Sequence, residues 1–342
     1  MVCEEVLEAV RAGGLLGRPE PLLVMLSGGR DSTCLLDLAV ALRPAGSVRA
    51  LHVNYALRAQ ADAEEAHCAA LCARLGVALE VVRAGADAPA MPAPAPAKPA
   101  HGPAPSQVPP AAAGNLQAWA RELRYRAAAE LAAADGALIA SGHTASDQAE
   151  TILYRLAASP GRRALLGMAP EEGGVLRPLL VITREQTASY CSGRGLQWLE
   201  DASNDDRRFA RARVRGELLP ALRAVHPAAE SNVLRTALLL REETELLEQL
   251  VRAELGHESS VTLARLGELP AALARLVLVR LAEEAVGTYV PQAGDRVQEI
   301  LALGRRGGRA ELHVGGGAGA VIERGVVRMV RLPPRAAAAD GD

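Results

Sequence analysis

A glycine-rich loop that carries two serines and an aspartate is the first feature of this sequence that could do chemistry. The segment Ser27-Gly28-Gly29-Arg30-Asp31-Ser32 follows the apolar run PLLVML and precedes an apolar helical pattern. In that position main-chain N–H groups and the positive end of a helix point at one place, which favours phosphate binding. The glycines let the backbone approach the anion, and the serine hydroxyls can donate to its oxygens. The loop therefore predicts a phosphate site.

Asp31 is the unusual member of this loop, because a carboxylate repels phosphate oxygens unless a cation lies between them. Mg²⁺ prefers carboxylate and phosphate oxygens as ligands, so Asp31 is the candidate metal ligand. The loop differs from the GxxxxGK[ST] type, since Lys98 is the only lysine of the chain. A plain glycine turn between strand and helix is the simpler alternative, but the strand, the aspartate and the second serine together favour the phosphate site.

The elements that must position this loop form an alternating pattern. Strand-like segments are followed by helical ones over about 63–76, 115–134, 145–158 and 183–194. This alternation predicts an α/β fold, a Rossmann-like parallel sheet covered by helices on both faces. Residues 85–114 hold nine prolines and predict a surface insertion. A proline-rich ligand for a partner is the alternative interpretation of that insertion.

The second part of the chain has a different pattern. From about residue 208 it predicts long amphipathic helices (208–224, 227–256 and 268–286), and then short valine- and arginine-rich segments of a hairpin or meander. Seven of the eight aromatic residues precede residue 210, which indicates two differently built cores. We therefore expect a catalytic domain over 1–220 and a mainly helical C-terminal domain with a small β tail over 221–342.

Composition limits the class of protein. The 342 residues are 49% hydrophobic, contain no run of the ~18–20 apolar residues that a membrane span needs, and include only five cysteines. We expect a soluble cytoplasmic protein without a disulfide framework. The net charge of −2 gives no sign of nucleic acid, but segments 207–241, 242–258 and 305–335 carry +6, −5 and +5. The two basic segments could bind the phosphates of a nucleic acid.

Several segments together resemble one family. SGGRDS is similar to the pyrophosphate loop of the N-type ATP pyrophosphatases, the PP-loop superfamily, which split ATP between its α and β phosphates. Six further segments occur in order: LHVNYALR (51–58), NLQAWARELRY (115–125), ASGHTASDQAETILYRL (140–156), RPLL (177–180), WLEDASN (198–204) and RARVR (211–215). Their combination resembles the tRNA(Ile)-lysidine synthetases over about residues 21–220.

The resemblance implies a ligase that joins free lysine to the wobble cytidine of a tRNA(Ile) with a CAU anticodon. ATP would adenylate the cytosine carbonyl oxygen and release pyrophosphate, and the lysine amine would then expel AMP. The implied cofactors are ATP and Mg²⁺, and the implied partners are this tRNA and L-lysine. By motif position the loop residues 27–32 would hold the pyrophosphate part of ATP. His52 and Asn54, at the end of the second strand, would line the adenosine pocket.

The resemblance also implies where the other substrates bind. Asp147 and Glu150, three residues apart near a helix start, would recognise the lysine ammonium group or bind metal and deprotonate the amine. Helix capping is the simpler role for these two acids. Arg121 and Arg124 share a helix face with Tyr125 nearby and would bind phosphate. His143 is open between general base, RNA contact and structural histidine.

Arginines near residue 210 complete the predicted site. Arg208, Arg211 and Arg215 would form one helical stripe that binds tRNA phosphate or the lysine carboxylate. A solvated helix face is the alternative. The sequence departs from the family pattern at Tyr55-Ala56, Ser146 and Ala212, where His-Gly, Asp or Asn, and Asn are commoner; these positions concern the finer contacts of the site.

Two other functions remain as alternatives. A tRNA thiolation enzyme of the same superfamily would depend on cysteines, and no CxxC pair is present. A degenerate module that only binds nucleotide or RNA would have no need of Asp31, Asp147 and Glu150. The sequence leaves the oligomeric state open between a monomer and a homodimer.

Overall fold

A computed structural model describes residues 2–56, 60–84, 110–158, 161–200 and 210–333, with only the backbone described over 110–118. It divides into two compact units, Met1–Arg235 and Thr236–Asp342. Each unit has its own hydrophobic core and is described separately below. None of the described helices combines the length and the apolar character needed to cross a bilayer.

The first unit contains a six-stranded sheet in the order β3-β2-β1-β4-β6-β5. Its strands are β1 (Leu22–Met25), β2 (Val48–Asn54), β3 (Ala78–Arg83), β4 (Leu138–Ala140), β5 (Glu171–Glu172) and β6 (Val175–Leu176). All neighbours are parallel except β5, which pairs antiparallel with β6. Because β1 has β2 on one side and β4 on the other, the chain reverses its direction of strand addition beside β1. Ligands bind at such switch points in open α/β sheets.

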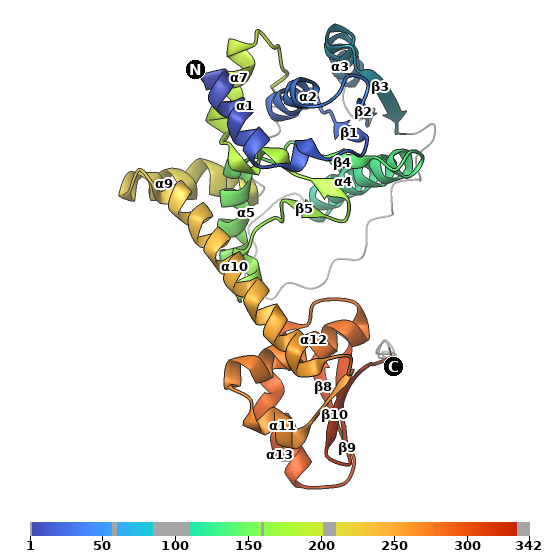
Figure 1. Cartoon of the computed structure of the whole chain (residues 1–342), viewed down its shortest axis with the longest axis vertical. Helices are drawn as coiled ribbons and strands as arrows, with labels where there is room; N and C mark the ends of the chain where they lie inside the picture. Colours follow the sequence, from blue (N-terminus) through green and yellow to red (C-terminus); the bar gives the residue numbers. More distant parts are fainter. Residues whose placement is uncertain (1, 57–59, 85–109, 159–160, 201–209, 334–342) are drawn as a thin grey trace, which may run out of the picture. The chain divides into compact units, whose positions relative to one another are not determined.

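Alternating side chains of β1 build the two faces of this sheet. Leu22, Val24 and Leu26 belong to one core, and Leu23 and Met25 belong to the core on the opposite face. This is the period-two pattern of a strand buried on both sides. Helices α1, α2 and α7 lie on the first face and α4 lies on the second (Figure 1). The predicted α/β class with helices on both faces is therefore confirmed.

The helical segments of the first unit agree with the sequence pattern at most ends. They are α1 (Val2–Ala12), η1 (Leu15–Gly17), α2 (Arg30–Leu42), α3 (Ala61–Leu75), α4 (Pro110–Ala133), α5 (Ala145–Ala158), α6 (Arg162–Leu165), η2 (Pro178–Val181), α7 (Arg184–Gly193), α8 (Ala210–Arg213), η4 (Val214–Leu218) and α9 (Leu219–Val225). The prediction that irregular structure extends to residue 114 is wrong, because α4 begins at Pro110, a residue type that suits the first turn of a helix. Residues 85–109 of the predicted insertion lie outside the described residues.

The predicted helix over 208–224 contains an unexpected turn. Between α8 and α9 the five residues of η4 form a π-helical turn, so the run from Ala210 to Val225 is helical but not uniformly α-helical. Single π turns occur often at functional sites because they re-aim a side chain. Arg215 lies in this turn.

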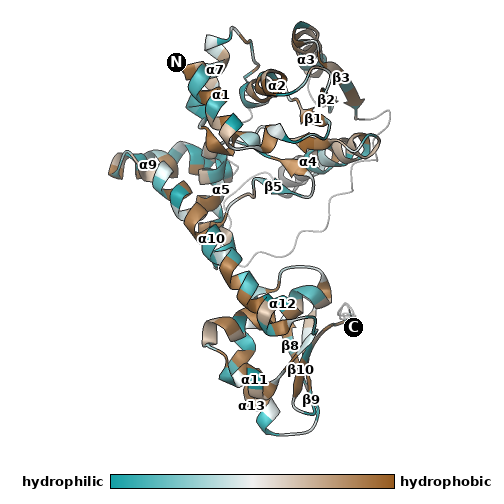
Figure 2. Ribbon diagram, viewed as in Figure 1, coloured by the Kyte–Doolittle hydropathy of each residue, from teal (hydrophilic) through white to brown (hydrophobic). Residues whose placement is uncertain are grey.

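The second unit packs helices on a four-stranded antiparallel sheet in the order β7-β10-β9-β8. Its elements are the later part of α10 (Ala229–Leu255), β7 (Ser260–Thr262), α11 (Leu263–Glu268), α12 (Ala271–Val286), η5 (Pro291–Arg296), α13 (Val297–Arg305), β8 (Ala310–Gly315), β9 (Ala318–Glu323) and β10 (Val326–Arg331). Hydrophobic and hydrophilic residues alternate along α10 (Figure 2), as its amphipathic pattern predicts. The helix predicted over 268–286 begins later, at Ala271, because Pro270 ends the preceding short helix.

Candidate active site

The predicted phosphate loop joins β1 to α2 at the carboxyl end of β1. Gly28 has φ +80°, and a Cβ there would lie 3.2 Å from the Cys68 Sγ and 3.3 Å from the Leu199 Cδ1. Only glycine fits this left-handed, crowded position without strain. The Ser32 hydroxyl donates to the Gly29 carbonyl at 2.9 Å and accepts from the Ser27 N–H at 3.2 Å. The serines that could donate to a phosphate therefore also fix the loop.

A second loop lies directly against the phosphate loop. A Cβ on Gly142, which follows β4, would lie 3.1 Å from both the Asp31 carbonyl carbon and the Ser32 nitrogen. The absence of a side chain at this glycine therefore lets the Ser141–Thr144 segment approach the start of α2. The sequence reasoning passed over Gly142, although its place in the GHT segment next to a strand end was a usable signal.

Asp31 lies at the start of α2, in the region predicted to hold phosphate. Its Oδ1 accepts hydrogen bonds from the Thr187 hydroxyl at 2.5 Å and from the Arg30 Nε at 3.1 Å. Its Oδ2 lies 3.9 Å from the Arg184 Nε. Among the described residues no group of three acidic, histidine or cysteine side chains forms a metal cage. A single carboxylate beside phosphate oxygens nevertheless suits Mg²⁺, which keeps waters and shares substrate phosphates.

The two predicted carboxylates Asp147 and Glu150 lie together and share two arginines. Arg184 donates from Nη2 to Asp147 Oδ1 at 2.6 Å and from Nη1 to Glu150 Oε1 at 2.9 Å. Arg215, from the π turn, donates to both Glu150 oxygens at 2.7 and 3.1 Å. With Asp31 and its partner Arg30, this carboxylate–arginine cluster contains three acids and three arginines, so its formal charges balance.

Asp147 serves two roles at once. Its Oδ2 accepts from the Thr144 N–H at 2.9 Å and from the Thr144 hydroxyl at 2.7 Å, which caps the start of α5. Its other oxygen binds Arg184, so capping and site geometry come from the same carboxylate. Burial works to raise the pKa of Asp147, but the Arg184 guanidinium and the Thr144 hydrogen bonds outweigh it and the pKa falls below its usual range. Asp147 is therefore ionised at neutral pH.

His143 lies at the end of the β4 segment, next to this cluster. Burial is the main cause that lowers its pKa to about 4, while nearby Asp147 raises it and the positive charges of Arg121, Arg177 and Arg211 lower it further. Its Nδ1 lies 2.6 Å from the Ser141 hydroxyl. The imidazole is therefore neutral at physiological pH and is a weaker base than an ordinary histidine.

Comparison with known proteins places this site in a family. A family model described as a PP-loop domain matches residues 6–222. The chain belongs to the PP-loop domain family. The Ser27–Ser32 loop lies within the matched residues and is called the PP-loop below.

The PP-loop domain is similar to that of several curated bacterial proteins. Proteins named tRNA(Ile)-lysidine synthase from Pseudomonas fluorescens (strain Pf0-1) and Azoarcus sp. (strain BH72) are each 37% identical, over 243 and 255 residues. These matches cover 69% and 72% of this chain and 49% and 51% of the relatives. The chain thus spans about half the length of the curated relatives it matches.

A solved structure shows the same fold at greater distance. The U34-tRNA thiolase NcsA from Methanococcus maripaludis superimposes with a TM-score of 0.52 at 17% identity, covering 70% of this chain and 79% of that chain. At this identity the similarity concerns the fold alone.

Other predicted site residues lie further from Asp31, Asp147 and Glu150, or make their contacts outside this cluster. The buried His52 has its Nδ1 3.0 Å from the Leu26 carbonyl oxygen, and the buried Asn54 donates to Asp62 and Glu65 at 3.2 and 2.9 Å. Both are at the carboxyl end of β2, next to the PP-loop. His52 thus contacts the residue that follows β1, and Asn54 contacts the first turns of α3.

Arg121 and Arg124 make contacts with aromatic rings on the α4 side of the sheet. Arg124 Nε donates to the Tyr55 hydroxyl at 2.9 Å, and the Arg121 guanidinium lies 4.7 Å from the Tyr125 ring centre. Tyr55, one of the departures from the family pattern, thus holds Arg124 in place. The positive charge of Arg121 also lowers the pKa of His143, which indicates that this part of α4 lies near the cluster.

The predicted arginine stripe separates into different environments. Arg211 is exposed, Arg215 is half-buried against Glu150, and Arg208 lies outside the described residues. Sequence reasoning missed Arg184 and Thr187. A signal for Arg184 existed, because a cation in the first turn of a helix opposes the helix dipole and needs a reason.

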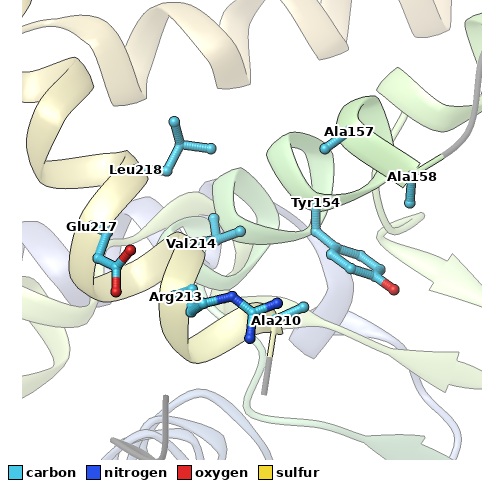
Figure 3. Close-up of a pocket in the computed structure, with 8 residues that line it drawn as sticks. All are labelled: Tyr154, Ala157, Ala158, Ala210, Arg213, Val214, Glu217 and Leu218. Carbon is cyan, nitrogen blue, oxygen red and sulfur yellow. The ribbon is translucent and has the colours of Figure 1, made fainter. Parts of the chain in front are cut away.

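A shallow apolar groove of about 580 Å³ lies beside this site, between the end of α5 and the π turn (Figure 3). Tyr154, Ala157 and Ala158 line one side, and Ala210, Arg213, Val214, Glu217 and Leu218 line the other. None of these is a predicted site residue. The PP-loop and the carboxylates do not line the groove, so pocket size alone does not locate the chemistry here.

Proposed function

We propose that this chain is a tRNA(Ile)-lysidine synthase, which uses ATP to ligate lysine to the wobble cytidine of a tRNA(Ile) with a CAU anticodon. The observation that supports this most is the location of Asp147 and Glu150. Both lie beside the PP-loop, where they are held by Arg184 and Arg215. The names of the curated relatives support the same activity.

The loop residues Ser27, Gly28, Gly29, Arg30 and Ser32 would bind the phosphates of ATP through main-chain N–H groups, hydroxyls and the start of α2. Asp31 would hold Mg²⁺, which neutralises phosphate charge when bound. His52 and Asn54, at the carboxyl end of β2, would face the adenosine side of the site.

The carboxylate–arginine cluster would hold the attacking lysine. Asp147 and Glu150 would orient its ε-ammonium group through their carboxylate oxygens. Because its pKa is about 4, His143 is too weak a base to deprotonate an ammonium group, and it would act as an uncharged hydrogen-bond partner in the site. A neutral, oriented amine is the nucleophile that the reaction needs.

Arginines around the cluster would bind the anionic parts of the substrates. The charges of Arg121 and Arg211 act on His143, and together with Arg124 and Arg208 these arginines would contact tRNA phosphate or the lysine carboxylate. Arg215 would act mainly through Glu150. The C-terminal region over 221–342 would bind tRNA with exposed arginines such as Arg305, Arg306, Arg309, Arg324 and Arg328. We expect the enzyme to act in the cytoplasm, where ATP and tRNA are available.

A thiolation enzyme is the second candidate, because the solved structure of similar fold is a tRNA thiolase. Thiolation requires an accessible, reactive thiolate. All five cysteines belong to the described residues and are free thiols, and four of them are buried. Burial raises the pKa of Cys68 to about 12 and that of Cys72 to about 11, so these thiols stay protonated. The environment of the cysteines therefore favours the ligase.

The test incubates the chain with ATP, Mg²⁺, labelled lysine and tRNA(Ile) transcripts with a CAU anticodon, and analyses the nucleosides by mass spectrometry. Lysidine is the expected product, and it should require both ATP and lysine. Asp147→Asn should abolish it, while Glu8→Gln on the distant helix α1 should not. A thiolated nucleoside, or lysine transfer unaffected by Asp147→Asn, would contradict the proposal. Binding of the tRNA should weaken steeply as salt is raised.

A further inference from the structure

Arg184 connects the three carboxylates of the site although no sequence motif singled it out. Its Nη2 and Nη1 donate to Asp147 and Glu150 at 2.6 and 2.9 Å, while its Nε lies 3.9 Å from Asp31 Oδ2. The three nitrogens of one guanidinium group thus point to three different acids. The distances show that two of these links are hydrogen bonds and the third is a longer-range attraction.

The helix that carries Arg184 does not need an arginine at this position. Arg184 is the first residue of α7, where the helix dipole disfavours a positive charge. The helix start is already stabilised by a capping box in which Thr183 and Gln186 satisfy each other's N–H groups. The Arg184 side chain therefore stabilises the carboxylates of the site and not the start of its own helix.

The backbone of Arg184 is fixed to the same helix as its side chain. Its N–H donates to the Ser146 hydroxyl at 3.2 Å, in the first turn of α5. Since the guanidinium group binds Asp147 and Glu150 of that helix, α7 holds the start of α5 by both backbone and side chain. Ser146 is a departure from the family pattern, and this hydrogen bond gives it a structural role.

Two carboxylates held this close would repel each other without a cation between them. Arg215 neutralises Glu150 at 2.7 Å, but its distance to Asp147 is 4.0 Å. Arg184 is thus the group that makes a hydrogen bond to both acids and sets their separation. Arg184 has 21% of its side chain exposed, so its geometry is largely determined by the protein.

We propose that Arg184 is a positioning residue for the amine: it holds Asp147 and Glu150 in the arrangement that receives the lysine ε-ammonium group. This inference rests on the proposed ligase function. Because the hydrogen bonds go to Asp147 and Glu150 and only the longer contact goes to Asp31, loss of Arg184 affects the lysine-dependent step more than the ATP-dependent step.

The experiment compares Arg184→Gln, Arg184→Lys and wild type in the two half-reactions. Adenylation is followed by ATP- and tRNA-dependent pyrophosphate release without lysine, and ligation is followed as lysidine formation over a range of lysine concentrations. Arg184→Gln should raise the KM for lysine about tenfold or more and change adenylation by less than about threefold. Arg184→Lys should recover part of the loss, because it keeps the charge but cannot bridge two carboxylates with a planar fork.

Arg194→Gln is the matched control for a purely structural effect. Arg194 directly follows the same helix and binds the buried Asp37 at 3.0 Å, away from the cluster. It should lower stability and leave the KM for lysine unchanged. Equal losses in both half-reactions of Arg184→Gln, or the same KM change in Arg194→Gln, would overturn the assignment. If wild type forms no lysidine, the proposed function itself fails and the inference fails with it.

Discussion

Replacement of Glu150 by glutamine tests the charge arrangement of the site through stability alone. The Glu150 side chain is 3% exposed and accepts one hydrogen bond from Arg184 and two from Arg215, at 2.9, 2.7 and 3.1 Å. Glutamine has nearly the same shape but removes the negative charge. It also turns an NH₂ group toward arginine donors, so at least one hydrogen bond is lost.

The expected cost follows from burial. Breaking a fully buried ion pair by removal of one partner costs about 3–5 kcal/mol. Here the arginine side chains are 21% and 30% exposed, so water can solvate part of their released charge. We therefore expect Glu150→Gln to lower the free energy of unfolding of the first unit by about 2–3 kcal/mol.

Tryptophan fluorescence during urea unfolding measures this quantity selectively. The two tryptophans of the chain, Trp119 and Trp198, both belong to the first unit and pack against its cores. The control is Glu8→Gln, whose carboxylate is 65% exposed and pairs only with the exposed Arg11, and which should cost less than about 0.5 kcal/mol. A loss below about 0.5 kcal/mol for Glu150→Gln, at an unchanged m-value, would refute the idea that Glu150 neutralises two site arginines.

Three further outcomes follow from the structure. The folded-state pKa of His143, about 4, lies below the ordinary 6.5, so the unfolded chain binds more protons between these pH values. The free energy of unfolding should therefore fall by up to about 3 kcal/mol as the pH drops from 6.5 to 4. The same titration of His143→Gln should be flatter, and an identical slope would contradict the burial of His143. Gly28→Ala should weaken ATP binding measured by calorimetry, and it should lower the free energy of unfolding by about 1 kcal/mol more than Gly46→Ala does. Both glycines have a positive φ, but of the two only Gly28 is crowded, so equal effects would argue against the crowding. Asp37→Asn should cost about 2 kcal/mol in urea unfolding, because Asp37 is 2% exposed and binds Arg194 and the Tyr190 hydroxyl; a neutral result would mean that this buried charge is not needed.

The fold was predictable where local patterns decide it. The buried strand before Ser27 and the apolar helix after it are visible as a run of apolar residues followed by helical spacing, and both form as β1 and α2. The same holds for α5, which begins and ends where the sequence pattern does. The first turns of α4 were missed, because a proline-rich segment hides the fact that Pro110 itself suits a helix start.

The site was only partly predictable. Glycine, aspartate and serine between a strand and a helix indicate the PP-loop, because these residues are neighbours in the sequence as well as in the structure. The sequence pattern did not predict the π turn that contains Arg215, because a π turn differs from an α-helix only by one residue in the spacing of its hydrogen bonds. The helix spacing of 211 and 215 therefore predicted a common stripe, whereas one side chain is exposed and the other faces Glu150.

By itself the sequence determined the alternation of strands and helices, the phosphate loop and the presence of two acids on one face of α5, because these depend on neighbours within a few residues. Tertiary structure decided which charges neutralise which. Glu150 meets Arg184 and Arg215 across 34 and 65 residues of chain, and Asp31 meets Thr187 across 156. Such pairs form only when the sheet order brings α2, α5 and α7 to the same edge, and the free energy of each pair depends on burial that no local segment specifies.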